Sequence, residues 1–111
     1  MEWHFDMVKD KFALLNIDDI RKVAIEGNWI DRISAIEYLW LINDDNCREY
    51  VLSGIKDEDL EIASIFILGE IGKLDDIPKL NQLINRERYY PLWNRHISDA
   101  IEKILNRSRS Q

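Results

Sequence analysis

The chain has 111 residues, of which 46% are hydrophobic and 32% charged, and its formal net charge is −6. This length predicts one domain with a substantial core, since a protein of about 110 residues buries roughly two-thirds of the surface of its unfolded chain. With only 4 glycines and 2 prolines the composition argues against disorder, and the single cysteine excludes an intrachain disulfide and the usual zinc-binding patterns.

The N-terminal segment argues against secretion and membrane insertion. Residues Met1–Asp6 carry acids where a signal peptide needs basic residues followed by an apolar run. No segment approaches the ~18 consecutive apolar residues of a membrane span. The unpaired Cys47 suits a reducing compartment. We therefore expect a soluble, cytoplasmic protein that does not act at a membrane.

The first predicted element is an amphipathic helix over residues 2–15. Its apolar stripe begins at Trp3, continues through Phe12 and ends at Leu15. We expect this segment, within residues 1–16, to cap the units that follow it in the chain.

Three short apolar motifs close successive helical segments after the cap. They are Leu39-Trp-Leu-Ile42, Leu68-Gly-Glu-Ile71 and Ile101-Glu-Lys-Ile104, and their recurrence at about one-repeat spacing indicates stacked helix pairs. Stacked pairs bury a core only against their neighbours and leave long surfaces free for binding. The predicted units are residues 17–44, 45–72 and 73–106, followed by a polar tail at residues 107–111.

Turn signals separate the predicted helices. Gly27 interrupts the first unit, and Asp75 and Asp76 precede Ile77-Pro78, where proline suits the first turn of a helix. We expect the paired acids to accept free backbone N–H groups at helix starts and to interact favourably with the helix dipole. The predicted helices are Ile20–Ile25, Asp31–Ile42, Cys47–Ile55, Leu60–Gly72, Ile77–Asn85 and Trp93–Asn106.

The central unit carries a recognisable pattern. Leu60–Gly72 ends in Leu-Gly-x-Ile-Gly, and Asp75–Leu80 supplies an acidic turn followed by Ile-Pro-x-Leu. This segment resembles a HEAT repeat of the short bacterial type that also occurs in phycobilisome-lyase-like proteins. Ile33–Asp44 and Trp93–Leu105 are similar to it more loosely, so the resemblance covers roughly residues 17–106.

The resemblance implies an all-α fold, a short right-handed α-solenoid of about three HEAT-like helix pairs with an N-terminal capping helix. The second helix of each pair would line the concave side. The family's members are mostly scaffolds and binding surfaces, so the resemblance implies no catalytic residue. The lyase-like relatives bind bilins, and the lone Cys47, in a first helix, gives little support for bilin binding here.

Turning each second helix at ~100° per residue separates core positions from exposed ones. In the central unit Leu68 and Ile71 face the core, whereas Ile62 and Phe66 point away from it. Aromatic residues surrounded by charge are typical of protein interfaces. The alternative is that the N-terminal helix or lateral packing buries the aromatic residues. The predicted partner-binding residues are Ile33, Glu37, Trp40, Asp59, Ile62, Phe66, Glu70, Arg95, Asp99 and Glu102.

A longer connection over residues 85–92 is a second candidate site, because it interleaves basic and aromatic residues. Such a segment can hold phosphates and stack on bases, or form a protein hot spot, or pack its aromatic rings on the last unit. Nucleic acid ranks last among these ligands because the protein is acidic. The residues of this candidate are Arg86, Arg88, Tyr89, Tyr90 and Trp93.

Catalytic groups are not arranged in any recognisable motif. His4 and His96 belong to no metal-binding spacing, and we expect Cys47 to be a small buried apolar residue. No glycine-rich phosphate loop occurs. We expect neither enzymatic activity nor a cofactor.

The leading functional hypothesis is an interaction protein that binds another, basic protein through its concave face. Its most specific form is an immunity protein that blocks a bacterial toxin, since nuclease toxins must be basic to hold their substrate. The alternatives are a HEAT-repeat adaptor in a larger assembly and a bilin or nucleic-acid binder that uses the 85–92 connection.

Overall fold

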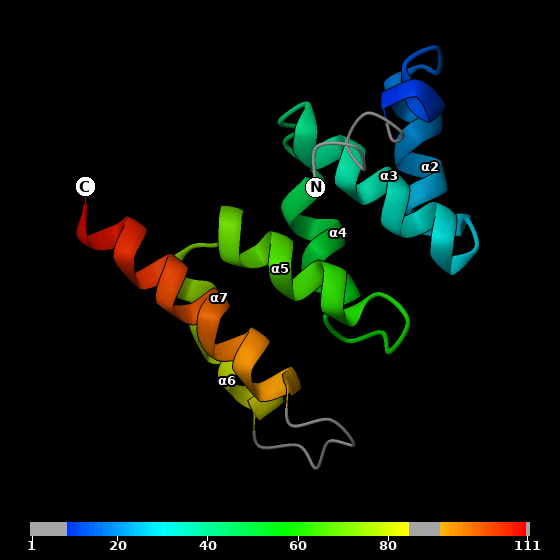
Figure 1. Cartoon of the computed structure of the whole chain (residues 1–111). Helices are drawn as coiled ribbons and strands as arrows, with labels where there is room; N and C mark the ends of the chain where they lie inside the picture. The colour runs from blue at the N-terminus through cyan, green and yellow to red at the C-terminus, as the bar shows by residue number, and fades with distance from the viewer. Residues whose placement is uncertain (1–8, 85–91, 111) are drawn as a thin grey trace.

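The computed structural model describes residues 9–84 and 92–110 (Figure 1). Within these ranges every regular element is a helix, which confirms the predicted all-α class. None of the described helices is long and apolar enough to cross a membrane. The elements are α2 (Ile17–Glu26), α3 (Trp29–Leu41), α4 (Cys47–Gly54), α5 (Glu61–Ile71), the 3-10 helix η1 (Leu74–Asp76), α6 (Ile77–Ile84) and α7 (Leu92–Arg109).

The predicted N-terminal helix falls only partly within the described residues. Residues 9–12 are helical, and Phe12 is buried against Tyr38 of α3, with 5.6 Å between the ring centroids. The prediction that this helix continues to Leu15 is wrong, because the chain turns after Phe12 and leaves Leu15 exposed. Trp3 lies outside the described residues.

Asparagine side chains start α2 and α3. Asn16 accepts a hydrogen bond from the backbone N–H of Asp19, and Asn28 accepts one from Asp31, each at 2.9 Å. These caps satisfy backbone donors that no helical carbonyl reaches. Because Asn28 is the cap, α3 begins at Trp29, two residues before the predicted start at Asp31.

The end of α3 depends on one left-handed residue, Asn43, whose φ is 59°. The N–H of Asn43 donates to the Trp40 carbonyl at 3.0 Å, and the N–H of Asp44 donates to the Leu39 carbonyl at 2.8 Å. This pair of bonds is a Schellman motif, and asparagine tolerates the left-handed conformation better than most residues. The motif fixes the position of the Asp44 carboxylate.

The acidic turns join helices as well as starting them. The Asp44 carboxylate accepts a hydrogen bond from the Arg21 guanidinium of α2 at 2.6 Å. The fully buried Asp76 carboxylate accepts two from the Arg48 guanidinium of α4, at 2.5 and 3.1 Å. Asp76 also accepts the backbone N–H of Lys73 at 2.9 Å. In both pairs an arginine of one helix holds the acid that follows the next helix. The prediction of a capping role alone was therefore incomplete.

Helices α5 and α7 pack closely because small residues face one another. A Cβ atom added to Gly69 would lie 3.0 Å from the Cα and 3.1 Å from the Cβ of Ala100. In the same helix Leu68 is buried as predicted, while Ile71 is half-buried. The core also contains Phe12, Ile20, Ile36, Leu39, Val51, Leu80, Leu83, Ile97 and Ile104.

Helix α7 extends to Arg109, three residues beyond its predicted end at Asn106. The prediction of a polar tail from residue 107 is wrong for this part. Arg107 is half-buried and donates to the carbonyls of Gly69 at 2.9 Å and Gly72 at 2.6 Å. These carbonyls lie at the end of α5, where no further helical N–H is present to bond them.

Neighbouring helices pack as α2 with α3, α4 with α5 and α6 with α7, and α5 packs on α7 as well. In Figure 1 the helices α3, α5 and α7 run in the same general direction, with α2, α4 and α6 as their partners. Helix α5 makes far closer contact with α7 than with α3. This difference leaves room along the face shared by α3, α5 and α7.

Candidate partner-binding groove

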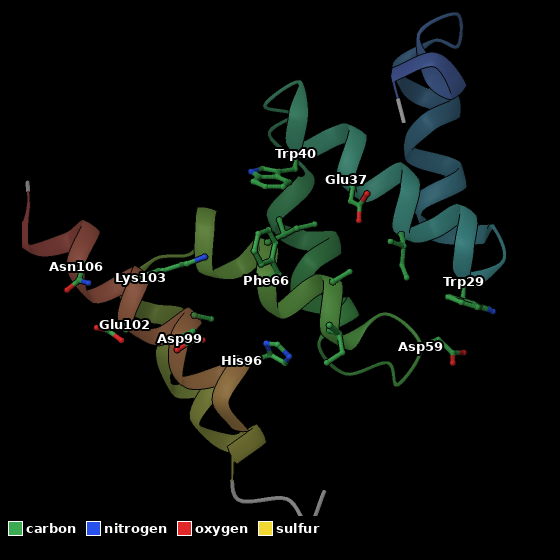
Figure 2. A pocket seen from close by; sticks show the side chains of 15 residues that line it. Trp29, Glu37, Trp40, Asp59, Phe66, His96, Asp99, Glu102, Lys103 and Asn106 are labelled. Atoms are coloured by element: carbon green, nitrogen blue, oxygen red, sulfur yellow. The ribbon is translucent and has the colours of Figure 1, made fainter. Parts of the chain in front are cut away.

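A groove of about 820 Å³ lies along α3, α5 and α7 (Figure 2). Each helix contributes side chains at helical spacing, such as Ile33, Glu37 and Trp40 from α3 and Ile62 and Phe66 from α5. Residues three or four apart share one face of a helix, so each helix presents a continuous stripe. The lining consists of Trp29, Ile33, Glu37, Trp40, Asp59, Ile62, Ala63, Phe66, Ile67, His96, Asp99, Ala100, Glu102, Lys103 and Asn106.

The structure gathers most of the sequence-predicted binding residues around this groove. Glu70 lies beside the groove, where its carboxylate accepts a hydrogen bond from Lys103 at 2.7 Å. Arg95 is exposed on α7 but is not part of the lining. The eight predicted residues in the lining are Ile33, Glu37, Trp40, Asp59, Ile62, Phe66, Asp99 and Glu102.

The centre of the groove is apolar and accessible. Phe66 is 44% exposed and Ile62 is 40% exposed, although six other residues of the same helix are buried. Trp40 is half-buried and packs edge-on against Phe66, with 6.0 Å between centroids and 78° between ring planes. This geometry is a favourable one for an aromatic pair. The described part of the chain does not bury Phe66.

The rim of the groove is predominantly acidic. Glu37, Asp59, Asp99 and Glu102 contribute carboxylates to the lining. Among the described lining residues, Lys103 is the one with a permanent positive charge. The local field therefore favours a positively charged ligand.

Sequence reasoning missed four polar or aromatic members of the lining, Trp29, His96, Lys103 and Asn106. Trp29 was missed because the predicted α3 began too late, and the capping potential of Asn28 was the signal that could have placed it. The three residues of α7 were missed because the groove faces a slightly different side of that helix. Asp99 lies on both the predicted face of α7 and the face that lines the groove, whereas Arg95 lies on the predicted face alone.

The second candidate site lies mostly outside the described residues. This holds for Arg86, Arg88, Tyr89 and Tyr90. Trp93 is described and belongs to α7, where it is half-buried and packs against the hydrophobic core.

Cys47 is buried, and its thiol lies 3.7 Å from the Ile36 carbonyl that accepts its hydrogen bond. Burial raises the pKa of this thiol from 9.0 to about 12, and the Asp44 carboxylate acts in the same direction. Among residues 9–84 and 92–110, no group of three or more His, Cys, Asp or Glu side chains is arranged to hold a metal ion. The environment of Cys47 is that of a core residue.

We therefore expect Cys47 to resist thiol reagents in the folded protein. At pH 8 a thiol with a pKa of 12 is ionised to about 1 part in 10,000, against roughly 1 in 10 at a pKa of 9, and the thiolate is the reactive form. Labelling by Ellman's reagent should be at least about 100-fold slower in buffer than in 8 M urea. Stoichiometric labelling of the native protein within seconds would contradict this. The un-ionised thiol stabilises the fold below pH 9, and this contribution is lost as the pH rises toward 12.

Comparisons of the chain with protein-family models, with curated proteins and with solved structures found no match. What the groove binds is accordingly inferred from the residues that form it.

Proposed function

We propose that this chain is a protein-interaction module that binds a basic partner protein through the groove between α3, α5 and α7. The observation that carries the proposal is the exposed pair Ile62 and Phe66, held on a rigid helix and surrounded by carboxylates. Aromatic anchors in a depression with a polar rim are where binding energy concentrates in protein interfaces. The proposal is one of binding rather than catalysis.

The fold that we propose to support this function is a short right-handed α-solenoid of HEAT-like helix pairs. The recurring ion pairs favour it, because Arg21 with Asp44 and Arg48 with Asp76 occupy corresponding places in two successive pairs. The parallel course of α3, α5 and α7 is a second argument (Figure 1). In such a stack, the second helices line one long surface.

In its most specific form, the proposal is an immunity protein that inhibits a basic bacterial toxin, such as a nuclease. Its support is the net charge of −6, the small size of the chain and the acidic rim of the groove. A nuclease must present a basic surface to its substrate, and an acidic inhibitor can cover that surface. The second candidate, an adaptor in a larger assembly, uses the same groove without inhibiting its partner.

The experiment measures binding kinetics between this chain and purified basic candidate partners, beginning with any basic protein encoded by a neighbouring gene. Phe66→Ala should weaken the complex by about 2 kcal/mol, roughly 30-fold in Kd, mainly through faster dissociation. Ile25→Ala is the matched control, because Ile25 is an exposed apolar residue of α2, at 58%, and lies outside the groove. It should leave Kd within about 2-fold, as a surface substitution away from the interface does.

Charge reversal on the rim separates steering from anchoring. Asp99→Lys with Glu102→Lys should slow association and reduce its salt dependence, since exposed charges act over about one Debye length. The control reverses Glu26 and Glu49 on α2 and α4, which do not line the groove.

Two outcomes discriminate among the alternatives. If the groove variants bind like the wild type while changes at Arg88 or Tyr90 abolish binding, the proposed groove is wrong and the 85–92 connection is the site. If the complex forms one-to-one and suppresses the partner's activity, the protein is an inhibitor. Binding without suppression, to several partners, would identify an adaptor.

A further inference from the structure

Lys103 of α7 reaches across to the aromatic centre of the groove (Figure 2). Its ammonium nitrogen lies 4.8 Å from the centroid of the Phe66 ring and 2.7 Å from the Glu70 carboxylate oxygen. The Phe66 ring and the Glu70 carboxylate therefore contact the same cation. Both interactions are attractive for any positively charged group placed there.

The Phe66 ring and the Glu70 carboxylate are both held by α5. Phe66 and Glu70 are four residues apart, so they lie one turn apart on the same face of the helix. Trp40 packs edge-on against the Phe66 ring and restricts its orientation. Phe66 remains 44% exposed in the presence of Lys103, so the site is open to solvent and to a partner.

The contact made by Lys103 is exchangeable. The side chains of Lys103 and Glu70 are 46% and 35% exposed, and ion pairs at this exposure contribute little stability. A lysine on a flexible stem can turn outward at small cost. Among the described lining residues, the carboxylates of Asp59, Asp99 and Glu102 outnumber the single ammonium of Lys103. A second cation brought by a ligand is therefore favoured.

We propose that Phe66, Glu70 and Trp40 form a cation-binding subsite that receives an arginine side chain of the partner, and that Lys103 occupies this subsite only in the free protein. Arginine suits the subsite better than lysine, because its planar guanidinium stacks on an aromatic ring while it donates to a carboxylate. The inference rests on the proposed protein-binding role of the groove. It adds the chemistry of the residue that the groove selects.

The test starts from a phage-displayed library of random 16-residue peptides. The library is selected on the wild-type protein and depleted on Phe66→Ala. Selected peptides should share an arginine and an apolar residue at fixed spacing, and replacement of that arginine by glutamine should weaken binding about 10-fold or more.

The best peptide is then titrated against single variants of the folded protein. Lys103→Met should bind about 3- to 10-fold more tightly, because the internal competitor is gone. Lys22→Met is the matched control, since it removes the same charge from an exposed Lys-Glu pair on α2, and it should change Kd by less than about 2-fold. Glu70→Gln and Phe66→Leu should each weaken binding several-fold, because the first removes the charge and the second removes the ring but keeps an apolar side chain.

Each result supports or overturns the inference. Equal affinities of Lys103→Met and Lys22→Met, or weaker binding by Lys103→Met, would overturn it. Phe66-dependent peptides without a cation would also overturn it, yet they would leave the groove as a protein-binding site. Failure to select any Phe66-dependent peptide would overturn the subsite, while the partner complex tests the groove itself.

Discussion

Arg48→Met should lower the free energy of unfolding by about 3–5 kcal/mol, the cost of leaving one partner of a buried ion pair without the other. Asp76 is fully buried, and the Arg48 guanidinium supplies two of its hydrogen bonds. Methionine preserves much of the length and apolar stem of arginine but none of its charge. The Asp76 carboxylate would then be held chiefly by the Lys73 N–H and by Lys79, whose nitrogen is 3.8 Å away.

Equilibrium unfolding in urea measures this loss as a shift in midpoint at constant slope. Lys22→Met is the control, because its pair with Glu26 is exposed on both sides and separated by 3.9 Å. An exposed pair of this kind contributes about 0–1 kcal/mol. A loss for Arg48→Met no larger than that of the control would mean that the Asp76 pair does not hold α4 to the turn after α5.

Leu68→Ala should lower the free energy of unfolding by about 2–5 kcal/mol, the range for truncating a leucine in a packed core. Leu68 is fully buried in α5, whose close contact with α7 at Gly69 leaves the backbone little freedom to fill the resulting cavity. The control is Leu14→Ala, which deletes the same atoms from a side chain that is 98% exposed. It should lower the free energy of unfolding by less than about 1 kcal/mol.

Thermal unfolding and urea unfolding should agree on the order of these two leucine variants. Equal stability of Leu68→Ala and Leu14→Ala would show that α5 is turned differently about its axis. Since the exposure of Phe66 depends on that same orientation, such a result would also remove the aromatic centre of the groove.

The amino-acid sequence by itself determined which segments are helical and which side of each helix is apolar. A pattern of period 3.6 is local, so it assigns the orientation of α5 about its own axis, with Leu68 inside and Phe66 outside, without knowledge of neighbouring helices. The same register, transferred to α3, assigned Glu37 and Trp40 to one face. For this reason eight residues of the groove lining were identified before any packing was known.

Helix ends were less well determined, because they depend on interactions outside the helix. Because the Asn28 side chain caps α3, the helix starts at Trp29, earlier in the chain than predicted. Arg107 continues α7 past its predicted end because two carbonyls of α5 accept its hydrogen bonds. A polar, charged sequence such as residues 107–111 shows no sign of that distant partner.

Only the tertiary structure decided which charges meet. Asp44 and Asp76 were placed at turns by their sequence, but their arginines lie 23 and 28 residues earlier, and no local pattern links such positions. The contact of Lys103 with Phe66 and Glu70 likewise requires the packing of α7 on α5. Periodicity fixes the direction of a side chain about its own helix axis, whereas the distance between two helices depends on the side chains at their contact, here Gly69 and Ala100.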